Sequence, residues 1–383
     1  MPEGARRPRR AVTTPDEAVR GAGVRRPRRG ATTIEEVARA AGVSRQTVSN
    51  ALNAPHRVRP DTLERVTAAI RELGYQPDQS ARSLRSGARR TIGYLSPVDD
   101  PFDPNPLMAG FLEALVDAAG AQGLRVLLFR PAPGSGGTRD TSGAEDGTDA
   151  GDASGAGDAL AAIDELVAAR QVDGLVLADV LRDDPRIGHV ARAGVPFTTF
   201  GRTGPGEPQH WVDIGNGPAM AAVVRHLAER GHRRLGYVGG PEDLPWMAER
   251  RAGFLAEARR LGLTAEVAAG PDVAAVRGLL RRPDRPTAVA AASDLLALDV
   301  YEAVRAEGLT VGREVAVTGF HDTPLCRHLH PALTSVRLPL RAIAAALVER
   351  LLGQVRGERV PGAGLELATE LVVRASSGGR APQ

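Results

Sequence analysis

The sequence predicts two kinds of domain in one chain: a small α-helical domain of helix-turn-helix type, followed by a larger α/β body in two lobes. Three observations support this prediction. Residues 32–75 hold three short helical patterns separated by tight turns. From Thr91 onward, strand-like apolar runs alternate with helical stretches over about 280 residues, which is typical of parallel sheets. The two parts also carry opposite net charge.

The composition is that of a folded globular protein. Of 383 residues, 42% are hydrophobic and 25% are charged, and this length favours two or three domains. No run approaches the roughly 18 apolar residues that a membrane helix needs, and the Arg-rich N-terminus lacks the apolar stretch of a secretory signal. The single cysteine, Cys326, excludes an internal disulfide framework and a cysteine-cluster metal site. We therefore expect a cytoplasmic protein with no membrane partner.

The positive charge is concentrated at one end of the chain. All 49 basic residues are Arg, and residues 1–90 carry 19 of them against 9 acidic residues, a formal charge of +10. Residues 91–383 carry the other 30 against 37 acidic residues, a formal charge of −7. A basic head on an acidic body indicates a polyanionic partner at the head, most often nucleic acid, although a solvated Arg-rich tail would give the same asymmetry.

Residues 31–77 have the pattern of a helix-turn-helix domain. A first helix over 34–41 has one apolar face, and Thr33 begins it with a capping-box pattern. A glycine-containing turn leads to a second helix over 45–52, and a third helix over 60–73 has proline in its first turn. Two short helices joined by such a turn are typical of this motif.

The rest of the chain divides by composition. The predicted organisation is a disordered Arg-rich arm over 1–30, a short conditional helix and linker over 78–90, a two-lobed body over 91–373 and a flexible tail over 374–383. Within the body, residues 131–158 carry six acidic residues against one Arg in a Gly/Ala/Ser/Thr-rich context, which predicts a disordered acidic insert.

Seven apolar runs in the body are predicted as buried strands. They are TIGYL, LRVLLF, VDGLVLA, VPFTTF, RRLGYVG, TAVAAAS and VAVTGF. Ligands of parallel sheets bind beyond the carboxyl ends of the strands. In a two-lobed body, this rule predicts a small-molecule cleft between the lobes, with the loop Asp103–Leu107 forming part of its roof.

The sequence shows no motif of a common enzyme. No GxSxG, HExxH, GxGxxG or GxxxxGK[ST] string occurs, and the eight histidines lack metal-ligand spacing. We therefore expect no enzymatic activity, no cofactor and no bound metal. The alternative left open is a solute-binding or sugar-processing protein with the same two-lobed body, although a transport role would need a signal peptide.

Strings along most of the chain match one protein family in order. In the N-terminal part they are TTIEEVARAAGVSRQTVSNALN and RVRPDTLERVTAAIRELGYQPDQSARSLRSGARRTIGYL. In the body they are VDGLVL, GVPFTTFGR, ERGHRRLGYVGG, RRAGFLAEARRLGL, ASDLLALDVYEAVRAEGL, VAVTGFHDT and PALTSVRLP. This pattern resembles the LacI/GalR family of bacterial transcription regulators, from about residue 32 to residue 373, apart from the insert.

The resemblance implies a helix-turn-helix headpiece, a hinge helix, and a periplasmic-binding-protein-like (type I) body whose chain crosses between the lobes three times. By motif position, one lobe would hold about 91–200 and 320–336, and the other about 201–319 and 337–373. The implied function is a sequence-specific transcriptional regulator, a repressor of carbohydrate-use genes, whose operator affinity is controlled by an effector bound between the lobes. The implied partners are a palindromic operator in double-stranded DNA, a sugar effector and a second copy of the chain, with tetramers left open. The implied location is the nucleoid in the bacterial cytoplasm.

The family pattern also assigns DNA-binding roles to residues of the headpiece and hinge. The base-reading positions are Arg45, Gln46 and Asn50, whose side chains can form paired hydrogen bonds with guanine or adenine. Positions suited to phosphate contacts, which orient the protein without reading sequence, are Thr33, Ser44, Thr47, Ser49, Asn53, Arg57 and Tyr75. In the hinge, Leu84 would wedge into the minor groove and Ala81 would allow two hinge helices to approach closely.

The family pattern places the effector contacts in six positions of the body. They are Arg202, Trp246, Arg250, Ser293, Asp294 and His321. Arg250 would bind a hydroxyl or an anionic group, and Trp246 could stack on a sugar face. Where the family often has Gly-Phe-Asp-Asp, this chain has His321 in place of the first carboxylate, which changes both charge and reach.

Overall fold

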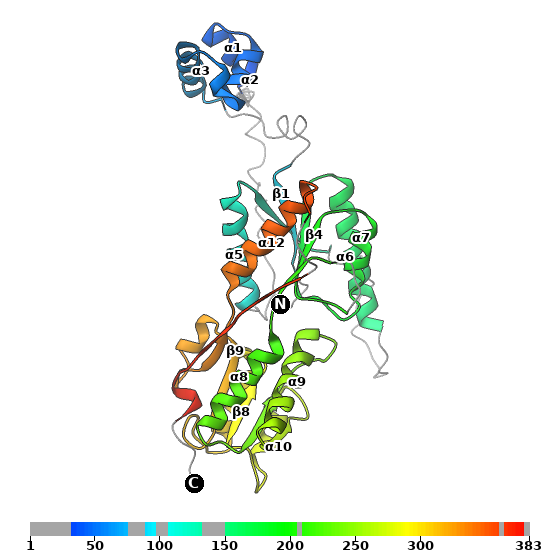
Figure 1. Cartoon of the computed structure of the whole chain (residues 1–383), viewed down its shortest axis with the longest axis vertical. Coiled ribbons are helices and arrows are strands. Elements are labelled where there is room, and N and C mark those ends of the chain that lie inside the picture. Colours follow the sequence, from blue (N-terminus) through cyan, green and yellow to red (C-terminus); the bar gives the residue numbers. More distant parts are fainter. Residues whose placement is uncertain are drawn as a thin grey trace, which may run out of the picture. The chain divides into compact units, whose positions relative to one another are not determined.

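The computed structural model describes residues 32–75, 89–96, 106–131, 150–204, 209–359 and 364–378. The chain divides into two compact units, Met1–Ser86 and Gly87–Gln383 (Figure 1). The predicted arm, almost all of the hinge and the first part of the predicted insert lie outside the described residues.

The first unit holds three helices around a small apolar cluster. They are α1 (Ile34–Ala41), α2 (Arg45–Asn53) and α3 (Pro60–Leu73), with a 3₁₀ turn η1 (Pro55–Arg57) before the third. The side chain of Thr33 accepts a hydrogen bond from the Glu36 backbone, and both halves of the predicted capping box are present. Glycines in the left-handed conformation end α1 and α3, where a side chain would be strained. The fully buried Val37, Val48 and Val66 come from one helix each, so the domain closes on local amphipathic patterns.

The second unit contains two six-stranded sheets, one in each lobe. The first sheet has the order β11-β5-β4-β3-β1-β2 and its strand pairs are parallel. Its strands are β1 (Thr91–Leu95), β2 (Arg125–Phe129), β3 (Gly174–Leu177), β4 (Phe197–Phe200), β5 (Trp211–Ile214) and β11 (Gly364–Leu367). Helices α5 (Pro106–Ala121) and α12 (Leu340–Val355) pack together on one side, and α6 (Ala150–Ala168) and α7 (Pro185–Arg192) contact each other as a second pair (Figure 1).

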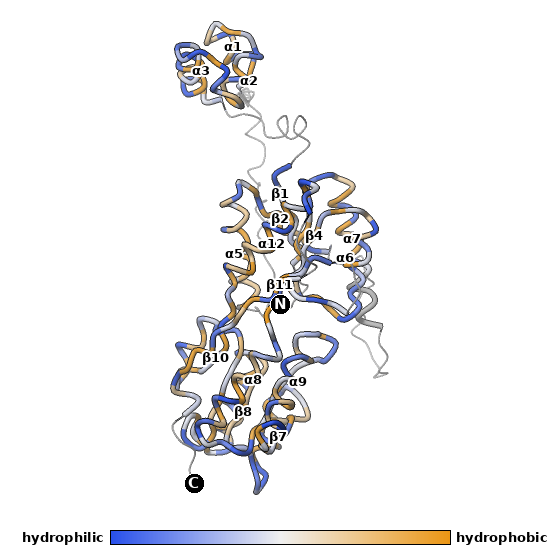
Figure 2. Tube along the Cα trace, viewed as in Figure 1, coloured by the Kyte–Doolittle hydropathy of each residue, from blue (hydrophilic) through white to orange (hydrophobic). Residues whose placement is uncertain are grey.

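The second lobe repeats this plan with the order β12-β10-β9-β8-β6-β7. Its strands are β6 (Arg234–Val238), β7 (Thr264–Val267), β8 (Ala288–Ala291), β9 (Ala316–His321), β10 (Thr334–Arg337) and β12 (Glu370–Val372), of which β12 is antiparallel to β10. Helices α8 (Asn216–Glu229) and α9 (Pro245–Arg260) form one pair, and α10 (Val273–Leu280) and α11 (Asp294–Ala306) form the other. The central strands are apolar and buried, whereas polar residues lie along the loops (Figure 2). The type I two-lobed fold is therefore confirmed.

The predicted division between the lobes is wrong in detail. Residues 201–214 belong to the first lobe, because β5 pairs with β4, and the chain crosses just after Ile214. Residues 320–336 belong to the second lobe, because β9 and β10 continue its sheet. The chain returns before α12, which packs on β3, β4 and β5, and crosses again between β11 and β12. The predicted number of three crossings is confirmed. The position of the first crossing was wrong because the four-residue run WVDI, which forms β5, is too short to stand out as a strand in the sequence.

Two segments that were predicted as unstructured have structure in part. Helix α6 begins at Ala150, so residues 150–158 of the predicted insert are helical. In the predicted tail, residues 375–377 form a 3₁₀ turn in which Ser376 and Ser377 are buried. The Ser376 hydroxyl donates to the Val317 carbonyl (2.6 Å) and accepts from the Thr334 backbone N–H (2.8 Å). The serine hydroxyl here hydrogen-bonds to backbone groups of the sheet. Composition alone does not reveal this, because small polar residues are also typical of flexible tails.

Among the described residues, no helix is both long and apolar enough to span a membrane.

The close contact between α8 and α9 depends on two glycines. Gly217 lies in α8 and Gly253 in α9, and a Cβ added at Gly253 would overlap the carbonyl oxygen of Gly217. Because the obstacle is backbone, a side chain here would force the helices apart. Asn216 of α8 and Trp246 and Arg250 of α9 line the pocket described below.

Gly253→Ala should lower the free energy of unfolding by about 1–3 kcal/mol, the usual cost of overpacking. Gly278→Ala is the matched control, because this exposed glycine of α10 has no atom within 4 Å of the added Cβ and alanine favours helix. Urea denaturation followed by circular dichroism measures both. Equal effects of the two substitutions would contradict the proposed role of the helix contact.

Candidate functional site

Helix α2 presents the three predicted base-reading residues. Ser44 caps its N-terminus by accepting a hydrogen bond from the Thr47 backbone, which leaves Arg45 and Gln46 exposed in the first turn. The Gln46 amide donates to the Asn50 side chain at 3.0 Å, so these two residues lie one turn apart on the same face. Arg45 forms an exposed ion pair with Glu35 of α1 (3.2 Å), a contact worth about 1 kcal/mol or less. The helix therefore offers polar side chains that only weak local contacts hold.

The residues predicted to contact phosphates fall into several groups. Thr33, Ser44 and Thr47 are used at helix N-termini, where Ser44 and Thr47 also hydrogen-bond each other at 2.9 Å. Arg57 is exposed, whereas Tyr75 is half-buried against the apolar cluster. Ser49 is only 7% exposed, which gives its side chain little access to a phosphate. Asn53 ends α2, and the hinge positions Ala81 and Leu84 lie outside the described residues.

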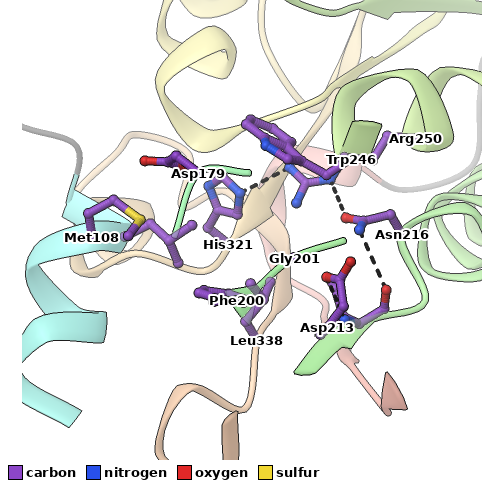
Figure 3. A pocket seen from close by; sticks show the side chains of 12 residues that line it. Met108, Asp179, Phe200, Gly201, Asp213, Asn216, Trp246, Arg250, His321 and Leu338 are labelled. Atoms are coloured by element: carbon purple, nitrogen blue, oxygen red, sulfur yellow. Dashed lines mark hydrogen bonds between the residues drawn. The ribbon is translucent and has the colours of Figure 1, made fainter. Parts of the chain in front are cut away.

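A pocket lies between the two lobes of the second unit. It holds about 480 Å³ of space between the side chains, part of it open to solvent. The first lobe contributes the ends of β3, β4 and β5 and the start of α5, and the second lobe contributes α8, α9 and the end of β9 (Figure 3). Its lining residues are Leu107, Met108, Asp179, Phe200, Gly201, Asp213, Ile214, Asn216, Trp246, Arg250, His321 and Leu338.

Arg250 is the central polar group of this pocket. It is 3% exposed, and its Nε donates to Asn216 Oδ1 at 2.9 Å. Its Nη1 donates to the Ala292 carbonyl at 2.7 Å and to His321 Nε2 at 2.9 Å (Figure 3). The guanidinium carbon also lies 4.6 Å from the ring centre of Trp246 and 3.6 Å from that of Phe320. Burial lowers the pKa of Arg250 to about 9, so the side chain stays charged at neutral pH.

His321 is neutral in this environment. Its pKa lies well below the ordinary value, first because of burial and then because of the adjacent Arg250 charge. Since Nε2 accepts from Arg250, the ring proton of neutral His321 lies on Nδ1. The backbone of His321 has a φ of 112°, an unfavourable conformation for a residue with a side chain. Such strain is typical of a residue whose position serves a site.

Asp213 supplies a carboxylate at the end of β5. It is 5% exposed and accepts one hydrogen bond from the Ile214 backbone at 2.7 Å. Burial, which this hydrogen bond only partly offsets, raises its pKa to about 6. Asp213 lines the pocket together with Arg250 and His321, but from the other lobe. It can accept hydrogen bonds there, and burial makes its ionised form unfavourable.

Arg202 and the pair Ser293–Asp294, predicted as effector contacts, do not line the pocket. Arg202 extends from the first lobe and donates to Glu249 of α9 at 3.0 Å, so it bridges the lobes. Ser293 caps α11 through the Leu296 backbone. Asp294 is 1% exposed and accepts from the Ser335 hydroxyl (2.6 Å) and the Thr323 backbone (2.8 Å). These polar groups already have structural partners.

Comparison with known proteins identifies the family. A family model described as bacterial regulatory proteins, lacI family, matches residues 33–78, and one described as periplasmic binding protein-like domain matches residues 224–377. The HTH-type transcriptional regulator CelR of Thermobifida fusca is 33% identical over 343 residues, covering 87% of this chain and 94% of the relative. The chain belongs to the LacI family of bacterial regulators.

Further relatives and solved structures agree with this assignment. The HTH-type transcriptional repressor CytR of Escherichia coli K12 is 29% identical, with 87% of this chain and 93% of CytR covered. The Lac repressor dimer bound to operator and the anti-inducer ONPF has a TM-score of 0.74 at 25% identity and covers 91% of this chain and 99% of its own. The CelR–cellobiose complex has a TM-score of 0.63 at 30% identity, with 90% and 99% covered.

The LacI-family protein is thus a DNA-binding transcriptional regulator with a separate effector-binding domain, and it is not an enzyme. The alternative of a solute-binding or sugar-processing protein is not favoured, because relatives that match 87–88% of the chain are named as regulators.

Sequence reasoning found three residues of the pocket, Trp246, Arg250 and His321, and the end of the predicted roof loop, Leu107. It missed Asp213 and Asn216, which stand on either side of the first lobe crossing. The signal that could have found them is the general rule that ligands gather at strand ends, applied to the short run WVDI. Asp179, Phe200 and Leu338 come from separate crossovers and strand ends, which only the folded chain brings together.

Asp213→Asn should stabilise this LacI-family protein in a pH-dependent manner. The folded-state pKa of about 6 lies above the ordinary 3.8, so the stability contributed by this carboxyl is present below pH 4 and is lost as the pH rises through 6. The free energy of unfolding of the variant, minus that of the wild type, should rise from near zero at pH 4 to about 3 kcal/mol at most at pH 7. Urea denaturation at pH 4, 5, 6 and 7 measures this difference, and a difference independent of pH would contradict it.

Proposed function

We propose that this LacI-family regulator represses carbohydrate-use genes, and that a sugar bound in the pocket between the lobes changes its affinity for the operator. The observation that carries the proposal is the pocket itself. It combines an aromatic face at Trp246, donors at Arg250 and His321, and an acceptor at Asp213, which together match the apolar faces and hydroxyl edges of a sugar ring. The cellobiose complex of CelR, a similar protein, supports a sugar ligand.

We propose a homodimer that binds a palindromic operator in the cytoplasm, on the nucleoid. A Lac repressor structure of similar fold is a dimer bound to operator, which supports this assembly. Two headpieces related by twofold symmetry would read two half-sites, so the operator should have matching symmetry. A further pairing into tetramers is not part of the proposal.

The proposed base-reading residues are Arg45, Gln46 and Asn50 of α2. Their support is exposure and position, since the first turn of a recognition helix points at base edges in the major groove. The proposed phosphate contacts are Thr33, Ser44, Thr47, Asn53, Arg57 and Tyr75, and the proposed minor-groove contacts of the hinge are Ala81 and Leu84. The burial of Ser49 removes it from this set.

In the body, the proposed effector contacts are Trp246, Arg250 and His321, together with Asp213 and Asn216 from the pocket wall. Arg202 is instead proposed to set the orientation of the two lobes through Glu249. Because both side chains are about 30% exposed, this ion pair is a modest and salt-sensitive contribution.

Selection of bound duplexes from random sequence should yield a palindrome, and Arg45→Ala should then relax the preference at one base pair of each half-site. The expected loss of discrimination there is about 1–3 kcal/mol per half-site. Arg57→Ala should weaken binding to all duplexes alike, because phosphate contacts do not read sequence. Arg65→Ala, an exposed arginine of α3, removes the same charge elsewhere and is the control. Fluorescence anisotropy with single base-pair variants measures these effects, and an unchanged preference profile for Arg45→Ala would count against the assignment.

A sugar effector should change operator affinity, and Trp246→Ala should reduce the change. Each protein is titrated with the selected duplex in the presence and absence of cellobiose, maltose, glucose and galactose, and the response is the ratio of the two affinities. Couplings of about 1–3 kcal/mol correspond to roughly 5–150-fold. Trp246→Phe keeps an aromatic face and should retain part of the response. Wild-type protein whose operator affinity responds neither to these neutral sugars nor to the corresponding sugar acids would exclude the proposed effector class.

A further inference from the structure

The guanidinium of Arg250 has donors left over for a ligand. Arginine has five N–H groups, of which Nε uses one on Asn216 and Nη1 uses two, on Ala292 and His321. Nη2 donates to none of the described residues, and Arg250 lines the pocket. Two N–H groups of a buried cation are therefore available on the second-lobe wall.

His321 adds a third donor to the same wall. Its Nε2 lone pair is occupied by the Arg250 N–H, so the neutral ring carries its proton on Nδ1. Nδ1–H donates to no other group in the described part of the chain, and His321 also lines the pocket beside Arg250 (Figure 3). A carboxylate at this position would instead accept a hydrogen bond from a ligand hydroxyl and would neutralise Arg250.

Three carboxylates near Arg250 on the second lobe are engaged with other groups. Asp322, next to His321, forms ion pairs with Arg337 (2.8 Å) and Arg374 (2.6 Å). Asp294 is held by Ser335 and Thr323, and Glu249 by Arg202. Among the described residues, no carboxylate oxygen lies within hydrogen-bond distance of Arg250. Its hydrogen-bond partners in that part of the chain are an amide, a carbonyl and an imidazole.

A buried cation that no carboxylate contacts directly is costly, because the charge loses its hydration, and here Asp213, Asp294 and Glu249 attract it only from a distance. The aromatic faces of Trp246 and Phe320 offset part of this cost. An anion that reached Nη2 and His321 Nδ1–H would offset much more, since hydrogen bonds between ionised groups are the strongest in proteins. The carboxylate of Asp213, which lines the pocket, comes from the opposite lobe. The pocket thus has a donor wall and an acceptor wall.

We propose that the effector is a carbohydrate that carries a carboxylate, such as a uronic or aldonic acid, whose carboxylate binds Arg250 and His321 while its hydroxyls face Asp213. This inference rests on the proposed function, in which a sugar occupies the pocket, and it specifies the chemical class of that sugar. Trp246 lies beside Arg250 and would cover one face of the ring. His321 determines the preference, since it gives Arg250 a neutral neighbour where family members often have a carboxylate.

Calorimetry on the full-length protein tests this with matched pairs of ligands: glucose and glucuronate, galactose and galacturonate, cellobiose and cellobionate. At least one acid should bind at least tenfold more tightly than its neutral partner, equivalent to about 1.4 kcal/mol. Its affinity should fall with added salt more than that of the neutral sugar. Neutral sugars that bind as tightly as their acids would overturn the inference and leave the proposed function intact. Binding of neither kind would overturn both.

Substitutions at His321 separate charge from structure. His321→Asp places a carboxylate beside Arg250 and should lower the affinity for the preferred acid at least tenfold while sparing its neutral partner, so the preference is lost or reversed. His321→Asn keeps the position neutral with a side chain that can donate, and it should retain the preference. Circular dichroism confirms that both variants fold. A ratio of acid to neutral affinities that is the same in wild type and His321→Asp would overturn the assignment.

Discussion

The pocket is organised around one buried cation. Arg250 comes from α9, yet its hydrogen bonds reach the first residue of α8, the loop after β8 and the last residue of β9. One guanidinium therefore fixes the relative positions of three chain segments on the wall of the second lobe. Burial first, and then the adjacent Arg250 charge, lower the pKa of His321 and keep it in the neutral form. Both the shape and the hydrogen-bonding character of this wall depend on the same side chain.

The other wall depends on where the chain crosses between lobes. The first crossing follows β5 directly, so Asp213 on the first lobe and Asn216 on the second lie three residues apart in sequence but belong to different lobes. A movement of one lobe relative to the other would change the distance between acceptor and donor walls. Arg202 and Glu249 also join the two lobes, and their partial exposure makes them a contact that can open. A ligand that contacts both walls thus acts on the geometry of the whole domain.

The headpiece is built on a different principle. Its core consists of small apolar side chains contributed by three short helices, and its helix ends are defined by a capping box, a serine cap and left-handed glycines. Most of these features act within a few residues of chain. The polar first turn of α2 is left outside this core, where local contacts of modest strength hold Arg45 and Gln46. Such residues can exchange their present partners for bases at small cost.

The sequence by itself determined the family, the helix-turn-helix domain and the alternation of strands and helices, because these follow from local periodicity, caps and motif order. It also identified Arg250, Trp246 and His321, which lie in or beside recognisable strings. Only the tertiary structure decided the lobe boundaries, since strand order depends on pairing between residues far apart in sequence, such as β11 with β5. The partners of polar groups also depend on the tertiary structure. Asp294 accepts a hydrogen bond from Ser335 and Arg202 pairs with Glu249, whereas Asp213 lines the pocket. Hydrogen bonds are made between neighbours in space, and sequence spacing does not encode which of several carboxylates will remain available.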